Sequence, residues 1–152
     1  MQQFLAQISL VVKEYDEAID FYVNKLGFEL IEDTVLSPDK RWVRIKPANA
    51  PTQGCHLLLA KASSTEQLNV IGNQTGGRVF LFLYTDNFNK YYELLLKNDV
   101  KIVRPPSEES YGRVLVFSDL YGNLWDLIEP KVSPESNTTE SLSWDYETEW
   151  SL

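Results

Sequence analysis

The 152-residue sequence predicts an α+β fold in which two βαβββ modules form a cupped mixed sheet. Three observations support this prediction. An apolar strand pattern is followed by an amphipathic helix and a second extended segment. The same order of elements recurs in the second half of the chain, and further short strand patterns follow each copy. We expect one domain over residues 1–130, with a first module at 4–60, a linker at 61–77 and a second module at 78–130.

The first strand–helix–strand unit opens with the apolar, β-branched segment Gln7–Val12. Asp16 is placed to cap the helix that follows, and Gly27 is placed to end it with a left-handed turn. Phe28–Ile31 then leaves in an extended pattern. The apolar stripe of the helix consists of Ala18, Ile19, Phe21, Tyr22 and Leu26.

The rest of the first module alternates turns and strands. Glu32–Lys40 reads as a polar turn region, and Arg41–Ile45 and Cys55–Ala60 read as strands. Strand alternation places Cys55 on the face opposite His56, where we expect it to be a buried apolar side chain. Residues 61–77 are rich in Ser, Thr, Asn, Gln and Gly and predict a linker.

The second module repeats the pattern over Val79–Val103, with an offset of 73 residues when Tyr15 is aligned with Phe88. Few residues are identical, so an unrelated pair of strand–helix units is the alternative interpretation. The elements expected to follow are a loop at Pro105–Tyr111, a strand at Arg113–Phe117, a turn at Asp119–Gly122 and a strand at Leu124–Glu129.

Composition excludes several classes of partner. A formal net charge of −8 argues against nucleic acid and anionic membranes, and no apolar run is long enough to span a bilayer. The single cysteine and the absence of a signal pattern at the N-terminus predict a cytoplasmic setting. An acidic body favours cationic ligands, although net charge alone is weak evidence.

Residues 131–152 form an acidic tail that carries half of the net charge and includes Trp144, Tyr146 and Trp150. We expect its aromatic side chains to dock on the chain itself or on a neighbouring subunit; a crystal contact is the alternative.

Two motifs carry a family resemblance: AIDFY followed by LGF at residues 18–28, and DLYGN followed by LIEP at residues 119–130. With the βαβββ repeat between them, they resemble the vicinal oxygen chelate superfamily, which includes glyoxalase I, bleomycin- and fosfomycin-resistance proteins and extradiol dioxygenases. The resemblance spans Phe4–Pro130. It implies a homodimer, with cups formed within or between chains.

The resemblance also implies a divalent metal held at four strand positions, where it acts as a Lewis acid. Those positions fall on Gln7, His56, Phe80 and Asp126. Phenylalanine cannot bind a metal, and a register slip of two residues would bring Arg78 or Phe82 to its place, which restores no ligand. Dioxygenase and fosfomycin-type chemistry are therefore disfavoured.

Each remaining metal-ligand candidate also has a structural interpretation, and Gln7 is most often just a polar strand residue. His56 is the only histidine, and such a residue on an apolar strand is more often a core residue than a ligand. Asp126 could pair with Arg44, Arg78 or Arg113 instead, because an inward carboxylate is costly without a partner.

Strand alternation predicts an aromatic cleft with a few polar groups, which is typical of a small-molecule site. Trp125 is expected at its rim. The residues expected to bind the ligand are Gln7, Ser9, His56, Arg78, Phe80, Phe82, Tyr84, Tyr111 and Asp126.

Two hypotheses about function follow. The first is a protein that binds a small organic molecule in this cleft without a full metal site, as in the bleomycin-resistance branch. The second is a glyoxalase-like lyase or isomerase with one divalent metal on Gln7, His56 and Asp126. Alternatively, the aromatic side chains could serve only to pack a hydrophobic core.

Overall fold

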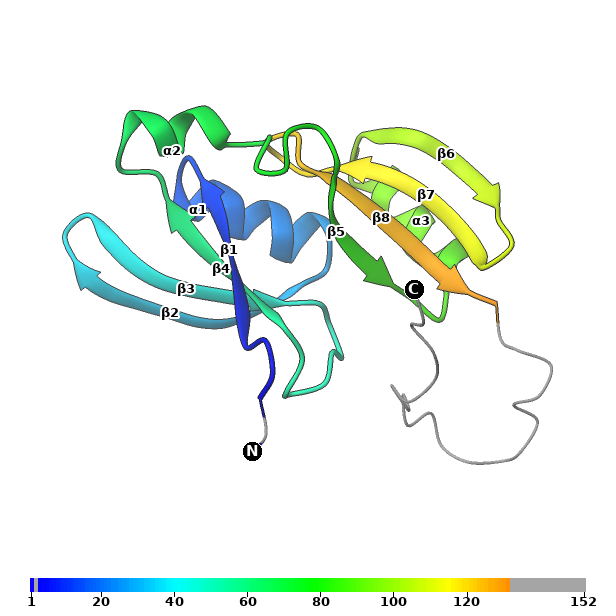
Figure 1. Cartoon of the computed structure of the whole chain (residues 1–152), viewed down its shortest axis with the longest axis horizontal. Helices are drawn as coiled ribbons and strands as arrows, with labels where there is room; N and C mark the ends of the chain where they lie inside the picture. Colours follow the sequence, from blue (N-terminus) through cyan, green and yellow to red (C-terminus); the bar gives the residue numbers. More distant parts are fainter. Residues whose placement is uncertain (2, 132–152) are drawn as a thin grey trace.

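The computed structural model describes residues 1 and 3–131 and confirms the α+β class and the two βαβββ modules (Figure 1). The first module consists of β1 (Gln7–Val12), α1 (Tyr15–Ile19) with a π-helical continuation (Asp20–Lys25), β2 (Glu29–Ser37), β3 (Lys40–Lys46) and β4 (His56–Lys61). The second consists of β5 (Val79–Tyr84), α3 (Phe88–Lys97), β6 (Ile102–Glu108), β7 (Gly112–Ser118) and β8 (Leu124–Pro130). Along the sequence, a short helix, α2 (Thr65–Val70), separates the two modules.

The strands form two separate sheets of four with the same topology. Their orders are β1-β4-β3-β2 and β5-β8-β7-β6. In each sheet the first two strands are parallel and the other neighbours antiparallel. This shared order agrees with the predicted repeat.

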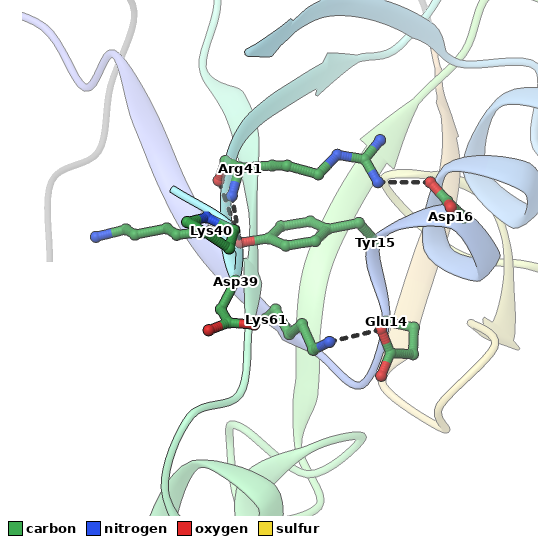
Figure 2. A pocket seen from close by; sticks show the side chains of 8 residues that line it. Glu14, Tyr15, Asp16, Asp39, Lys40, Arg41 and Lys61 are labelled. Carbon is green, nitrogen blue, oxygen red and sulfur yellow. Dashed lines mark hydrogen bonds and ion pairs between the residues drawn. The ribbon is translucent and has the colours of Figure 1, made fainter. Parts of the chain in front are cut away.

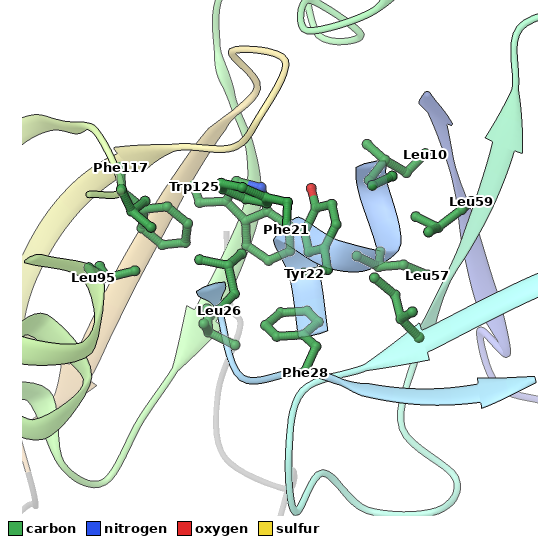
Figure 3. Close-up of a cluster of buried hydrophobic side chains, with 14 of the residues drawn as sticks. Leu10, Phe21, Tyr22, Leu26, Phe28, Leu57, Leu59, Leu95, Phe117 and Trp125 are labelled. Carbon is green, nitrogen blue, oxygen red and sulfur yellow. The ribbon is translucent and has the colours of Figure 1, made fainter. Parts of the chain in front are cut away.

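The helix-facing sides of both sheets share one hydrophobic core (Figure 3). Tyr22 and Phe28 from the first module pack against Trp125 from the second, with ring centroids 6.0 and 5.8 Å apart. Trp125 also stacks on Phe117 at 5.8 Å. Trp125 is therefore a buried residue between the modules, and its expected place at the rim of a cleft was wrong.

The turn after β7 joins the modules through the buried carboxylate of Asp119. One of its oxygens accepts hydrogen bonds from the backbone N–H groups of Tyr121, Gly122 and Asn123 at 2.9–3.0 Å. The other accepts from the Tyr22 hydroxyl at 2.6 Å and from the Asn123 side chain at 2.8 Å. Burial, followed by the Asp119 charge, raises the pKa of Tyr22 well above its ordinary value, so Tyr22 stays a donor. The two motifs that carried the family resemblance are thus hydrogen-bonded to each other.

Two local expectations in the first module were wrong. The helix begins at Tyr15 after Glu14, without a side-chain cap, and Asp16 pairs instead with Arg41 at 2.6 Å. Cys55 precedes β4 and is exposed, so it does not pack in the core. Gly27 does adopt the expected positive φ, at 73°.

Two segments expected to be loops are edge strands. β2 continues through the predicted turn region to Ser37, because Glu32 and Asp33 form ion pairs with Arg44 and Arg41 on the neighbouring strand. β6 includes both prolines of the predicted Pro105–Tyr111 loop. Its pairing with β7 is irregular where the prolines lie, which is how an edge strand accommodates residues without an N–H donor.

The predicted linker contains α2, whose start is capped by Ser64 accepting from the Gln67 N–H at 3.2 Å. Further along, the Gln74 side chain hydrogen-bonds to the outer edge of β1. It accepts from the Val11 N–H at 2.7 Å and donates to the Ser9 carbonyl at 3.2 Å. The linker is thereby fixed along β1 before the chain enters β5.

None of the described helices is long and apolar enough to cross a membrane. The expectation that Trp144, Tyr146 and Trp150 dock on the protein falls outside the described residues.

Candidate ligand-binding site

The faces of the two sheets that point away from the shared core carry the candidate site. On β5, Leu83 is buried in the core, whereas Phe82 and Tyr84 point away from it and are 61% and 56% exposed. Two large aromatic side chains exposed side by side on one strand are unusual for a surface that only faces water.

The register of β5 differs from the expected one. Its pairing with β8 is interrupted between Val79 and Leu81, and Phe80 in this irregularity packs against the core. Phe82, not Phe80, therefore lies opposite Asp126, as Gln7 lies opposite His56 in the first sheet. The register thus brings Phe82, the residue named for a two-residue slip, to the strand position expected for Phe80, and this residue is also a phenylalanine.

One row of side chains crosses the open face of the second sheet. Phe82 pairs with Asp126, Asp126 with Val116, and Val116 with Arg104, one residue from each strand. Residues paired across strands point to the same side of a sheet. Along the row, an aromatic ring is therefore followed by a carboxylate, an apolar side chain and a guanidinium.

A small pocket of about 90 Å³ lies along this row, bounded by Arg104, Tyr111, Val116 and Asp126 among others. Burial raises the pKa of Asp126, and the positive charge of Arg104 opposes that shift. The pocket can hold a small polar head group of a ligand, but not a whole drug-sized molecule.

Asp126 does not have the ion-pair partner expected from the sequence. Arg44 pairs with Glu32 at 2.9 Å, and Arg113 pairs with Glu108 at 3.5 Å. Arg78 is exposed and precedes β5, outside this pocket. The positive charge that acts on Asp126 is that of Arg104, which sequence reasoning missed because Arg104 lay beside a segment read as a proline loop.

The first sheet presents Gln7, Ser9 and His56 on its open side. Both ring nitrogens of His56 are buried, and neither has a hydrogen-bond partner among the described residues. Burial and the nearby charges of Arg44 and Lys46 lower the pKa of His56. The imidazole is therefore neutral at pH 7 and has a free lone pair.

Because His56 is the only histidine, NMR titration of its ring protons reports a single pKa, which we expect to lie below 6.5. A folded-state pKa below the unfolded one favours the neutral form. The corresponding stabilisation is fully present above pH 6.5 and is lost as pH falls through the folded-state pKa. The free energy of unfolding of His56→Gln should lack this part of the acid dependence. A measured pKa above 6.5 would contradict the buried, unpaired geometry.

The structure brings together Gln7 with His56 and Phe82 with Asp126, but on different sheets. Within the described residues there is no group of three His, Cys, Asp or Glu side chains that could hold a metal. A single sheet offers at most an amide oxygen and an imidazole, two donors where metal sites use three or more.

A larger pocket, about 400 Å³, lies elsewhere, between the start of α1, the β2–β3 turn and the end of β4 (Figure 2). Four of its charged side chains are already engaged in ion pairs. Arg41 pairs with Asp16 at 2.6 Å, and Lys61 pairs with Glu14 at 2.8 Å. We therefore place the candidate site on the open sheet faces and not here.

A family model described as the glyoxalase/bleomycin resistance protein/dioxygenase superfamily matches residues 4–127, most of the chain. The chain belongs to this superfamily. A protein of Shewanella frigidimarina that bears the name "Uncharacterized protein" is 58% identical over 130 residues, covering 85% of this chain and 95% of that protein.

Two solved structures show the same superfamily fold at moderate identity. UcmS2 has a TM-score of 0.73 at 26% identity, with 85% of this chain and 99% of that chain covered. TnmS3, described as an antibiotic binding protein from Streptomyces sp. CB03234, has a TM-score of 0.68 at 27% identity, with 86% and 98% covered.

Proposed function

We propose that this member of the glyoxalase/bleomycin resistance superfamily binds a small aromatic molecule against the open face of its second sheet. The observation that carries the proposal is Phe82, an exposed aromatic ring at the strand position opposite Asp126. Phenylalanine there supplies a stacking surface and removes a metal ligand from that position. The similarity to TnmS3, an antibiotic binding protein, supports a binding role over catalysis.

A homodimer is part of the proposal, because the described residues leave two large aromatic side chains, Phe82 and Tyr84, exposed on the open face of the second sheet. Ligand sites usually bury most of their ligand, and a 90 Å³ pocket cannot do so. A second copy laid over this face would close the cleft. Light scattering should give a mass of about twice 17.5 kDa; a monomer mass at micromolar concentration would remove this part of the proposal.

The aromatic site is tested with Phe82→Ala. We expect it to weaken the binding of planar aromatic compounds about tenfold or more, measured by calorimetry, since stacking on an exposed ring contributes roughly 1–3 kcal/mol. Leu96→Ala is the control, because Leu96 on α3 is similarly exposed at 51% and lies outside this face. Equal binding by the wild type and both variants would contradict the assignment.

One observation favours a second candidate, a metal-dependent lyase or isomerase. His56 is a neutral imidazole next to Gln7, and its two buried nitrogens have no hydrogen-bond partner in the described part of the chain, which suits a borderline divalent ion. Asp126 would have to come from the second sheet or from a second copy. Titration of Ni²⁺, Zn²⁺, Mn²⁺ and Fe²⁺ into chelator-treated protein, with His56→Ala as control, tests it. Stoichiometric binding that the substitution abolishes would favour the enzyme.

A further inference from the structure

The pocket on the second sheet is lined by two opposite charges, the half-buried Asp126 and the exposed Arg104, whose side chains have no partner among the described residues. No hydrogen bond or ion pair joins the side chain of Asp126 or of Arg104 to any described residue, whereas Arg44, Lys46 and Arg113 each form an ion pair. Asp126 is half-buried but its oxygens are not among the buried atoms without a partner, so a donor from outside the pocket can reach this carboxylate. Since no described side chain engages either charge, both are available to bind groups of a ligand.

The spacing of the two charges explains why they do not simply pair. Asp126 is on β8 and Arg104 on β6, with Val116 of β7 between them in the same cross-strand row. Neighbouring strands lie about 4.8 Å apart, so the two backbones are about 10 Å apart. Their side chains are more than 4 Å apart, since no ion pair is present at that limit, and the pocket of about 90 Å³ lies between them.

The other polar groups of the pocket leave this gap available. Glu109 accepts a hydrogen bond from the Ser107 hydroxyl at 3.0 Å and is exposed at the rim. Tyr111 is also exposed, and its hydroxyl makes no hydrogen bond among the described residues. The floor of the gap is the buried side chain of Val116, which offers no polar atom.

We propose that the ligand carries a zwitterionic head group of the α-amino acid type, whose ammonium binds Asp126 and whose carboxylate binds Arg104. A carboxylate can accept two parallel hydrogen bonds from a guanidinium, and an ammonium is a strong donor to a carboxylate. The aromatic part of the same molecule lies over Phe82, the next residue in the row. This inference rests on the proposed aromatic site and names the chemical class of its ligand.

Four indole compounds with the same ring and different charges test the inference by ligand-observed NMR at pH 8. They are L-tryptophan (zwitterion), tryptamine (cation), indole-3-propionate (anion) and 3-methylindole (uncharged). We expect L-tryptophan to bind about tenfold more tightly than either singly charged compound. Asp126→Asn should weaken L-tryptophan and tryptamine about tenfold and leave indole-3-propionate unchanged. Arg104→Gln should weaken L-tryptophan and indole-3-propionate and leave tryptamine unchanged.

Arg113→Gln is the control for Arg104→Gln. Arg113 is an arginine on the neighbouring strand whose guanidinium lies 4.4 Å from the Phe88 ring centroid, away from this pocket. Similar affinities for all four compounds, with no effect of the charge variants, would overturn the zwitterion inference while the aromatic site stands. Absence of binding by all four, together with no effect of Phe82→Ala on other planar compounds, would overturn the aromatic site as well.

Discussion

Asp119→Ala is expected to lower the free energy of unfolding by about 3–5 kcal/mol, measured by urea denaturation. The buried carboxylate accepts five hydrogen bonds, and its removal leaves the buried Tyr22 hydroxyl and three backbone N–H groups without their partner. The loss would affect both modules, because Tyr22 belongs to the first and Asp119 to the second. Tyr22→Phe removes only one of these bonds and should cost about 1–2 kcal/mol.

The control for Asp119→Ala is Glu93→Ala on the exposed side of α3, which should change stability by less than about 0.5 kcal/mol. A double-mutant cycle of Asp119→Ala with Tyr22→Phe should give a coupling energy of about 1–2 kcal/mol. If Asp119→Ala cost no more than Glu93→Ala, the turn would not join the modules as described.

Gly72→Ala is expected to cost about 3–4 kcal/mol, because the linker passes directly against the turn after β7. A Cβ at Gly72 would lie 1.9 Å from the Tyr121 carbonyl oxygen, a backbone atom that cannot rotate away. The residue also has a φ of 76°, where a side chain adds about 1–2 kcal/mol. Moving the linker would disturb the hydrogen bonds of Gln74 to β1 as well.

Gly76→Ala, in the same linker, separates the cost of the positive φ from the cost of the steric clash with Tyr121. Gly76 has a similar φ of 67°, but no atom lies within 4 Å of the position that a Cβ would take there. Its substitution should cost only the backbone part, about 1–2 kcal/mol. Equal losses for the two alanine variants in chemical denaturation would show that the close approach to Tyr121 is relaxed in solution.

The sequence predicted the modules because their signals are local. The stripe that includes Phe21 and Tyr22 repeats at helical spacing, and Gly27 marks the end of the helix with the expected positive φ. The polar segments were predicted incorrectly because ion-pair partners elsewhere in the sequence determine whether they form strands or turns. Glu32 and Asp33 read as turn residues until Arg44 and Arg41 are known to lie beside them in the sheet. By contrast, α2 carried a signal that was overlooked: Ser64 followed three residues later by Gln67, the sequence signature of a capping box, although the Gln67 side chain accepts from the N–H of Ser63.

The candidate site was less predictable than the fold. A single irregularity in β5 moves Phe80 toward the core and brings Phe82 opposite Asp126. No residue type in this segment predicts such an irregularity. Arg104 could be placed opposite Val116 only once β6 was known to pair with β7 across the prolines. Pairings across three strands cannot be read from spacing along the chain.

Mapping amide chemical shifts while L-tryptophan is titrated into the protein tests the location of the site. The largest changes should fall on the row that contains Phe82, Asp126 and Arg104. Changes concentrated around Tyr15 and Arg41 would instead place the ligand in the larger pocket of Figure 2 and would contradict a site on the open face of the second sheet.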